Sequence, residues 1–228
     1  MGAMTDDPAL TRSPSASVED YVKAIWEVAG SGAASTKDVA ERLSIAPPSV
    51  TNMFVRMQEM GLVEYERYRG ASLTRRGRGE ALRLIRRHRL IETFLLEHLG
   101  YTWREVHEEA ERLEHAVSDG FTERLAEFLG HPDQDPHGDP IPAADGSFAP
   151  DDSFPLGEAA AGQRVRISKV GDDPSTLEYL GDHGLVPGRL LSVREVRDLD
   201  GVVTVEDEDG GSHALGEALA RAVFVRGE

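Results

Sequence analysis

Apolar residues recur at helical spacing from about residue 18 and predict a first helix. The segment Ser17-Val18-Glu19-Asp20 reads as a capping box, with Ser17 as the N-cap and Asp20 at the N3 position. The helix is predicted to stop at Gly30-Ser31-Gly32. Residues 1–16 show no periodicity and are rich in Ser, Pro, Asp and Thr, so we expect an expression scar at Met1-Gly2-Ala3 and a disordered N-terminus.

A helix-turn-helix pattern follows. Ser35 or Thr36 caps a short helix over residues 37–43, and a turn leads into a second helix from Ser49 to about Met60, with Pro48 suited to its first turn. Two short strands within residues 62–74, joined by a turn that contains glycine, predict a wing. The segment is therefore predicted to be a winged helix-turn-helix domain, used either for DNA binding or for protein contacts alone.

Longer helices are predicted after the wing. The first runs from about residue 74 to residue 100, the second from residue 101 to about residue 120, and the helical pattern continues over residues 121–129. These helices carry more apolar surface than they need by themselves, which favours a dimer interface. The residues concerned are Leu90, Phe94, Leu95, Leu113, Val117, Phe121, Leu125 and Phe128.

The last third of the chain has a strand pattern. Residues 131–155 are rich in Pro, Gly and Asp and predict a linker, and four or five short strands from residue 163 onward predict a small SH3-like barrel. The predicted fold class is thus mainly α with small β. The predicted parts are residues 1–16 (tag or disordered N-terminus), 17–82 (winged helix-turn-helix), 83–135 (helical dimerisation and metal-binding domain), 136–156 (linker) and 157–228 (SH3-like domain).

Charge and composition limit the partners and the metal ligands that the protein can have. The formal net charge is −16, yet nine arginines lie between Glu64 and Leu90 against three acidic residues, and this local excess favours contact with DNA phosphates. The chain contains no cysteine, so a bound metal would be held by His, Asp, Glu, Met or carbonyl oxygens. No apolar run is long enough for a membrane span and no signal-peptide pattern is present, so we expect a cytoplasmic protein without membrane contact.

The segment 107–115 carries the candidate chemistry. If it is helical, His107, Glu111, Glu114 and His115 share one stripe, beside a parallel apolar stripe that is expected to be buried. A divalent cation would relieve the repulsion and the lost hydration of half-buried carboxylates. The alternative is a solvated acidic face that contains histidines by chance. His88 and Glu92 form a second His/Glu pair at i, i+4 spacing on the preceding helix.

In combination, these segments resemble the diphtheria toxin repressor family of metal-dependent transcriptional regulators, and specifically its manganese-responsive branch. The similar segments are Ser17 to Tyr21, the winged helix ending at Gly70, Arg87 to Glu92, His107 to Asp119, and Asp135 to Pro142. The resemblance implies a homodimer that binds a palindromic double-stranded DNA operator when metal is present. It implies a repressor of metal-uptake genes, with activation of efflux genes as an additional role.

The resemblance also implies two metal sites. The primary site would use Asp20, Glu111, Glu114 and His115, and the ancillary site would use His88, Glu92 and His107 with Asp173 or Asp172 from the barrel. The iron-responsive branch has methionine and cysteine where this chain has Asp20 and Glu111, and hard oxygen donors favour Mn²⁺, with Fe²⁺, Co²⁺ or Zn²⁺ as substitutes. Lys23 replaces an acidic residue of the single-domain manganese regulators, so separate sites are expected rather than their two-metal cluster.

The DNA contacts are expected at the recognition helix and the wing. The candidate residues are Lys37, Pro48, Ser49, Thr51, Asn52, Arg56, Arg67 and Arg69. Asn52, near the start of the recognition helix, is the candidate for reading base edges, and the arginines of the wing are candidates for phosphate contacts.

Two other functions compete with this interpretation. A sensor for iron or zinc with the same architecture is the alternative. A metalloenzyme is the remote one, because the zinc-protease motif needs a second histidine where Glu111 stands, and neither helix has the Glu-x-x-His motif of di-iron enzymes. We therefore expect no enzymatic activity.

Overall fold

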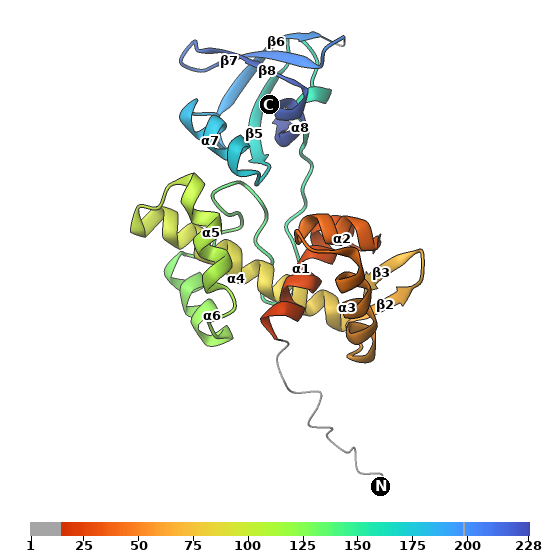
Figure 1. Cartoon of the computed structure of the whole chain (residues 1–228). Helices are drawn as coiled ribbons and strands as arrows, with labels where there is room; N and C mark the ends of the chain where they lie inside the picture. Colours follow the sequence, from red (N-terminus) through yellow and green to blue (C-terminus); the bar gives the residue numbers. More distant parts are fainter. Residues whose placement is uncertain (1–14, 198) are drawn as a thin grey trace. The chain divides into compact units, whose positions relative to one another are not determined.

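The computed structural model describes residues 15–197 and 199–228, and the predicted disorder of the N-terminus concerns residues that lie largely outside these ranges. The chain divides into two compact units, one up to Ile85 and one from Arg86 to Glu228. The long helix α4 (Arg75–Leu99) contributes to both (Figure 1). None of the helices in the described part is long and apolar enough to span a membrane.

The first unit is a winged helix-turn-helix domain, as predicted. Its elements are α1 (Ala16–Ala29), β1 (Ala33–Ala34), α2 (Thr36–Arg42), α3 (Pro47–Glu59), β2 (Val63–Glu66), β3 (Gly70–Leu73) and the start of α4. Ser35 caps α2 by accepting a hydrogen bond from the Asp38 amide. The expected capping box at Ser17 is wrong, because α1 begins two residues earlier, with Ser15 as its N-cap and no side-chain cap bond.

A three-stranded sheet in the order β1-β3-β2 forms the wing, and sequence patterning had missed the two-residue strand β1. Gly70 begins β3 at φ 98°, and a Cβ there would lie 2.1 Å from the carbonyl oxygen of Ala34 on β1. Only glycine fits this close approach of the two strands. Val22, Ile25 and Phe54 are fully buried in the core that joins these elements.

The helical part of the second unit contains the rest of α4, α5 (Trp103–Leu113) and α6 (Asp119–Phe128). The continuous helix expected from residue 101 to about residue 120 is wrong. The helix α5 ends at Leu113 with Glu114 as its C-cap, and Ser118 then caps α6 by accepting a hydrogen bond from the Phe121 amide. Serine favours an N-cap over a helix interior, so it starts a new helix here.

The C-terminal part is an SH3-like sheet domain. Six strands pair in the order β4-β9-β5-β6-β7-β8, all antiparallel, and the sheet is not closed by a pairing of β4 with β8 in the described part. The strands are β4 (Phe154–Pro155), β5 (Arg164–Val170), β6 (Leu190–Arg197), β7 (Val202–Asp207), β8 (Ser212–Leu215) and β9 (Val223–Gly227). The short helices are η2 (Leu156–Glu158), α7 (Pro174–Asp182) and α8 (Glu217–Ala222).

The segment between α6 and β4 has no helix or extended strand, as predicted, but its first half is packed. Gln134 and Pro140 form an isolated antiparallel bridge, and the carbonyl oxygen of His137 accepts a hydrogen bond from the Val170 amide at the end of β5. Gly138 adopts φ 88°, and a Cβ there would lie 2.1 Å from the Ser168 carbonyl oxygen. Residues 134–140 are therefore a docked turn against β5.

Candidate metal centre

His88, Glu92 and His107 meet in the interior of the second unit, as expected from the sequence. His88 and Glu92 face the same way because they are one helical turn apart on α4, and α5 adds His107. Glu92 Oε1 lies 2.9 Å from His88 Nε2 and 3.0 Å from His107 Nδ1, and these two nitrogens are 3.2 Å apart. The Glu92 side chain is only 2% exposed. Two imidazoles and a carboxylate thus converge at one buried point.

His88 uses both of its ring nitrogens. Its Nδ1 lies 2.6 Å from Glu114 Oε2, and Glu114 is fully buried. A metal-binding histidine usually donates one ring N–H to a carboxylate and binds the cation through the lone pair of its other nitrogen. Nε2, which faces Glu92 and His107, is then the nitrogen available to a metal. The donor set fits a divalent cation.

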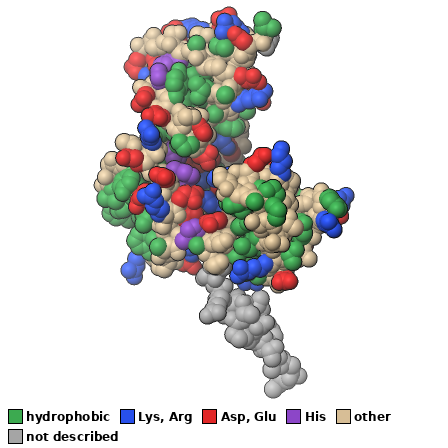
Figure 2. Space-filling view, viewed as in Figure 1, with side chains coloured by type: hydrophobic (Ala, Val, Ile, Leu, Met, Phe, Trp, Pro, Cys, Tyr) green, Lys and Arg blue, Asp and Glu red, His purple; other side chains and the backbone are tan. Residues whose placement is uncertain are grey.

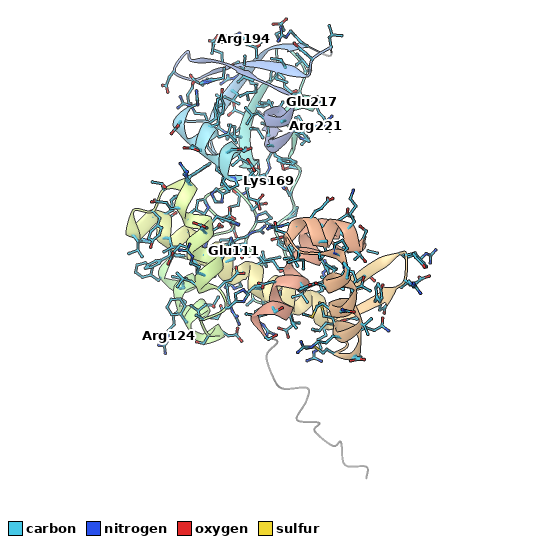
Figure 3. All side chains as sticks on the ribbon, viewed as in Figure 1. Glu111, Arg124, Lys169, Arg194, Glu217 and Arg221 are labelled. Carbon is cyan, nitrogen blue, oxygen red and sulfur yellow. The ribbon has the colours of Figure 1, made fainter. Side chains whose placement is uncertain are left out.

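Glu111, Glu114 and His115 lie at the end of α5 and in the turn after it. Glu111 is on the helix (Figure 3), and ligand atoms of His88, Glu111 and Glu114 lie within 4.8 Å of one another. His115 Nε2 is 3.6 Å from Glu114 Oε1. The single helical stripe expected over His107 to His115 is wrong, because α5 ends before Glu114. Asp20 lies on α1 in the first unit.

Sequence reasoning missed two buried residues beside Glu92. Asp135 and His137 belong to the docked turn, and ligand atoms of Glu92, Asp135 and His137 lie within 4.8 Å of one another. Their Pro- and Gly-rich surroundings predict a linker, so only the histidine inside Asp135-Pro136-His137-Gly138 could have hinted at this role.

The electrostatics of this cluster are unusual. Burial by itself would raise the pKa of the Glu92 carboxyl, but the charge of His88 and hydrogen bonds from His107 and His88 outweigh it and hold that pKa far below its usual range. Burial, together with the charges of Glu92 and Asp139, raises the pKa of Asp135 to about 8. Burial lowers the pKa of His137. The cluster therefore combines an ionised carboxylate with a second carboxylate that resists ionisation.

Asp173, the tentative barrel ligand, is exposed and serves as the N-cap of α7. Its Oδ1 accepts hydrogen bonds from the Thr176 amide and the Ser175 hydroxyl. Among the described residues it belongs to none of the groups with metal-ligand spacing, and neither does Asp172.

Three of the nine arginines that suggested a basic DNA-binding patch are engaged within the second unit. Arg86 pairs with Glu123, Arg87 with Asp119, and Arg89 donates to the Pro140 carbonyl beside Asp135. Their side chains are at most one fifth exposed, so they stabilise this unit rather than form a free basic surface. The charge count along the sequence therefore overstated the basic surface.

The candidate DNA-binding residues lie on the surface of the first unit. All eight are exposed except Thr51, which is half-buried and donates its hydroxyl to the Pro47 carbonyl oxygen at 3.3 Å. Ser49, Asn52 and Arg56 share one face of α3, opposite the buried face. Figure 2 shows Lys and Arg side chains at the tip of the wing, where Arg67 and Arg69 lie. Lys37 lies on α2, and the other seven lie on α3 and on the wing.

The helical part of the second unit exposes aromatic surface. Phe121 and Phe128 on α6 are 48% and 64% exposed, and Leu99 at the end of α4 is 57% exposed. The ring centroids of Phe94 and Phe128 are 5.9 Å apart, so the exposed ring continues a partly buried aromatic cluster. Surfaces of this kind commonly pair with a second subunit.

A winged helix-turn-helix unit together with a helical unit that has a buried His/Glu centre is the combination expected of a metal-dependent, DNA-binding transcriptional regulator. Family models match nearly the whole chain: the iron dependent repressor N-terminal DNA binding domain over residues 14–71, the iron dependent repressor metal binding and dimerisation domain over residues 74–143, and the FeoA domain over residues 154–227. The chain belongs to the iron-dependent repressor family, which includes the diphtheria toxin repressor. Its members are DNA-binding repressors and not enzymes.

Similar proteins include both iron and manganese regulators. The chain is 33% identical over 189 residues to the iron-dependent repressor IdeR of Mycobacterium leprae (strain TN), covering 77% of this chain and 82% of that one. It is 35% identical over 124 residues to the HTH-type transcriptional regulator MntR of Lysinibacillus sphaericus (strain C3-41), covering 54% and 88%. A solved manganese-dependent transcriptional repressor in complex with manganese is 38% identical, with a TM-score of 0.86 over 92% of this chain and all of that chain.

Proposed function

We propose that this protein is a manganese-activated repressor that binds a palindromic DNA operator as a homodimer and controls metal-uptake genes in the cytoplasm. The metal dependence and the DNA-binding class follow from the family. The identity of the metal, the operator symmetry and the regulated genes are our proposal.

The donor set supports manganese. The second unit contains neither cysteine nor methionine, since the five methionines of the chain lie at positions 1, 4, 53, 57 and 60. Any site built from this unit consists of nitrogen and oxygen donors alone. Carboxylate and carbonyl oxygens suit Mn²⁺, whereas thiolates and thioethers select softer ions. The similarity to manganese-dependent repressors points the same way, and the similarity to IdeR keeps Fe²⁺ as the second candidate.

The ligands of the proposed primary site are Asp20, Glu111, Glu114 and His115, and those of the proposed ancillary site are His88, Glu92 and His107. Asp20 enters this set from the family resemblance alone. A bound divalent cation would supply the positive charge that offsets the repulsion among these carboxylates. Asp173 remains a tentative ancillary ligand, and it would have to give up its role as a helix cap.

His88 connects the two proposed sites. Its Nδ1 lies 2.6 Å from Oε2 of Glu114, a proposed primary ligand, while its Nε2 faces the proposed ancillary site. The hydrogen bond orients both side chains before any cation binds. Preorganisation of this kind lowers the cost of binding.

Metal selectivity is tested by fluorescence anisotropy with a palindromic promoter fragment, titrating Mn²⁺, Fe²⁺ and Zn²⁺ separately under anaerobic conditions. We expect Mn²⁺ to activate DNA binding at concentrations at which Fe²⁺ does not. Equal or stronger activation by Fe²⁺ or Zn²⁺ would assign the protein to another metal within the same class.

The primary site is tested with Glu111→Ala and a matched control on the same helix, Glu108→Ala. Glu108 has the same charge but is exposed, and among the described residues its side chain pairs with Arg112 at 3.6 Å. Glu111→Ala should lose Mn²⁺-stimulated DNA binding, and Glu108→Ala should retain it. Asp20→Ala should behave like Glu111→Ala, and an unaltered metal response in that variant would remove Asp20 from the site.

The DNA contacts are tested by their salt dependence. Arg67→Ala and Arg69→Ala should weaken binding to all sequences and reduce the slope of log K against log salt by about one unit per lost phosphate contact. Asn52→Ala should instead change the preference among operator variants. An unchanged preference would exclude Asn52 as a base reader.

A further inference from the structure

A second group of candidate ligands shares Glu92 with the proposed ancillary site. The groups His88–Glu92–His107 and Glu92–Asp135–His137 are each compact to within 4.8 Å and have only Glu92 in common. In the first group Glu92 uses Oε1, whereas Oε2 is the oxygen that lies 3.9 Å from His137 Nδ1. The two carboxylate oxygens therefore face different sets of partners.

His137 is unsatisfied where it lies. The residue is 2% exposed, and its Nε2 has no hydrogen-bond partner among the described residues. Its Nδ1 is the nitrogen that faces Glu92 Oε2, at 3.9 Å, which is beyond hydrogen-bond distance. A buried polar nitrogen without a partner costs free energy, and this cost is relieved when the nitrogen binds a cation. The edge of the Trp103 ring packs against the imidazole at a centroid distance of 5.1 Å, which holds the ring in place.

Asp135 is presented to the same point by the backbone of its own turn. Its Oδ1 accepts hydrogen bonds from the amides of His137 and Asp139, both at 2.9 Å, and its Oδ2 lies 3.5 Å from Arg89 Nε. The carboxylate cannot rotate away without losing both amide bonds. Asp135 and Glu92 are thus two carboxylates held close together in the protein interior, an arrangement that a divalent cation stabilises.

We propose that Glu92, Asp135 and His137 form a third cation position, contiguous with the ancillary one, in which Glu92 is a bridging carboxylate between two divalent ions. The inference rests on the proposed ancillary site. Two ions that share a carboxylate in proteins lie roughly 3.5–4 Å apart. The ion is of the Mn²⁺ class, because two carboxylates and one imidazole are its donors.

The proposed third position would connect α4 to the docked turn, whereas the expected ligand Asp173 would connect the ancillary site to α7. His137 and Asp135 belong to the turn docked on β5, through the bond from the Val170 amide to the His137 carbonyl. Ligation at this point joins α4 to the docked turn. Asp173, on α7, takes no part.

The test is the number of Mn²⁺ ions bound per chain, measured by equilibrium dialysis with elemental analysis on the full-length protein. Asp135→Asn is the main variant, because an asparagine oxygen still accepts the two amide hydrogen bonds, and His137→Phe is the second, because it retains the contact with Trp103. Asp139→Asn is the control, since it removes a charge from the same turn but from outside the ligand group. Circular dichroism verifies that each variant is folded.

We expect Asp135→Asn and His137→Phe each to bind one Mn²⁺ fewer than the wild type, and Asp139→Asn to bind the wild-type number. The fully loaded wild type should also show an exchange-coupled Mn²⁺ pair by electron paramagnetic resonance, and Asp135→Asn should lose it. An unchanged number of ions in both ligand variants would overturn the third position and leave the ancillary site intact. A wild type that binds no Mn²⁺ would contradict the proposed function itself.

Discussion

Replacing Gly138 by alanine should release the docked turn from the barrel. The residue has φ 88°, and its added Cβ would lie 2.1 Å from the Ser168 carbonyl oxygen and 2.7 Å from the Lys169 Cα. Neither partner is a flexible side-chain end, so the turn itself must move. The strained backbone costs about 1–3 kcal/mol and the lost hydrogen bond from the Val170 amide about 1 kcal/mol, so docking weakens by roughly 2–4 kcal/mol.

Hydrogen exchange at the Val170 amide measures this effect directly, because that amide donates to the His137 carbonyl. A loss of roughly 2–4 kcal/mol corresponds to about 30-fold to 1,000-fold faster exchange through local opening. Gly146→Ala is the matched control: Gly146 lies in the same segment at φ 81°, but an added Cβ meets nothing within 4 Å. Equal exchange rates at Val170 in Gly138→Ala and the wild type would refute the docking.

Three further predictions concern the second unit. Leu90→Ala removes a fully buried side chain and should lower the free energy of unfolding by about 2–5 kcal/mol in urea titrations, whereas Leu199→Ala, at a fully exposed position, should change it by less than about 0.5 kcal/mol. Hydrogen bonds, first of all from His213, lower the pKa of the Asp207 carboxyl below its unfolded value, so its contribution to stability is present above about pH 4 and is lost in acid. The Tm of the wild type should therefore exceed that of Asp207→Asn near neutral pH, and the difference should shrink as the pH falls below about 4. A constant difference would contradict this cause. Phe128→Asp should shift the protein from dimer to monomer in sedimentation velocity, and an undisturbed dimer would place the interface elsewhere.

Most helices and strands could be predicted, because the residues that determine them are close together in the sequence. The helix-turn-helix, the wing, the long α4 and the strands of the barrel follow from apolar periodicity and turn residues. The end of α5 was not predictable from periodicity, because Leu113 and Val117 continue the apolar spacing through the break. Ser118 starts a new helix because its side chain accepts a hydrogen bond as an N-cap. The sequence alone does not distinguish an N-cap serine from a serine inside a helix.

The part of the candidate centre that lies on a single helix could be predicted from the sequence. His88 and Glu92 are one turn apart, so the pair could be read from the sequence, and the resemblance supplied His107. Asp135 and His137 approach Glu92 through the tertiary fold, more than forty positions along the chain, and no local rule announces such a contact. The basic surface was overpredicted, because the sequence cannot distinguish an exposed guanidinium from one that pairs with a carboxylate far away along the chain.

The docked turn also determines where a protease can cut the connection between the helices and the barrel. Peptide bonds must leave the folded surface to enter a protease active site. Residues 134–142 are held by the bridge from Gln134 to Pro140 and by hydrogen bonds from Arg86 and Arg89 of α4 to the carbonyls of Pro142 and Pro140. Residues 143–150 are mostly exposed. Because no Lys or Arg occurs from His131 to Ala160, trypsin finds no site in this stretch, and a protease of broad specificity should first cleave within 143–150. The resulting N-terminal fragment would keep every proposed metal ligand except Asp173.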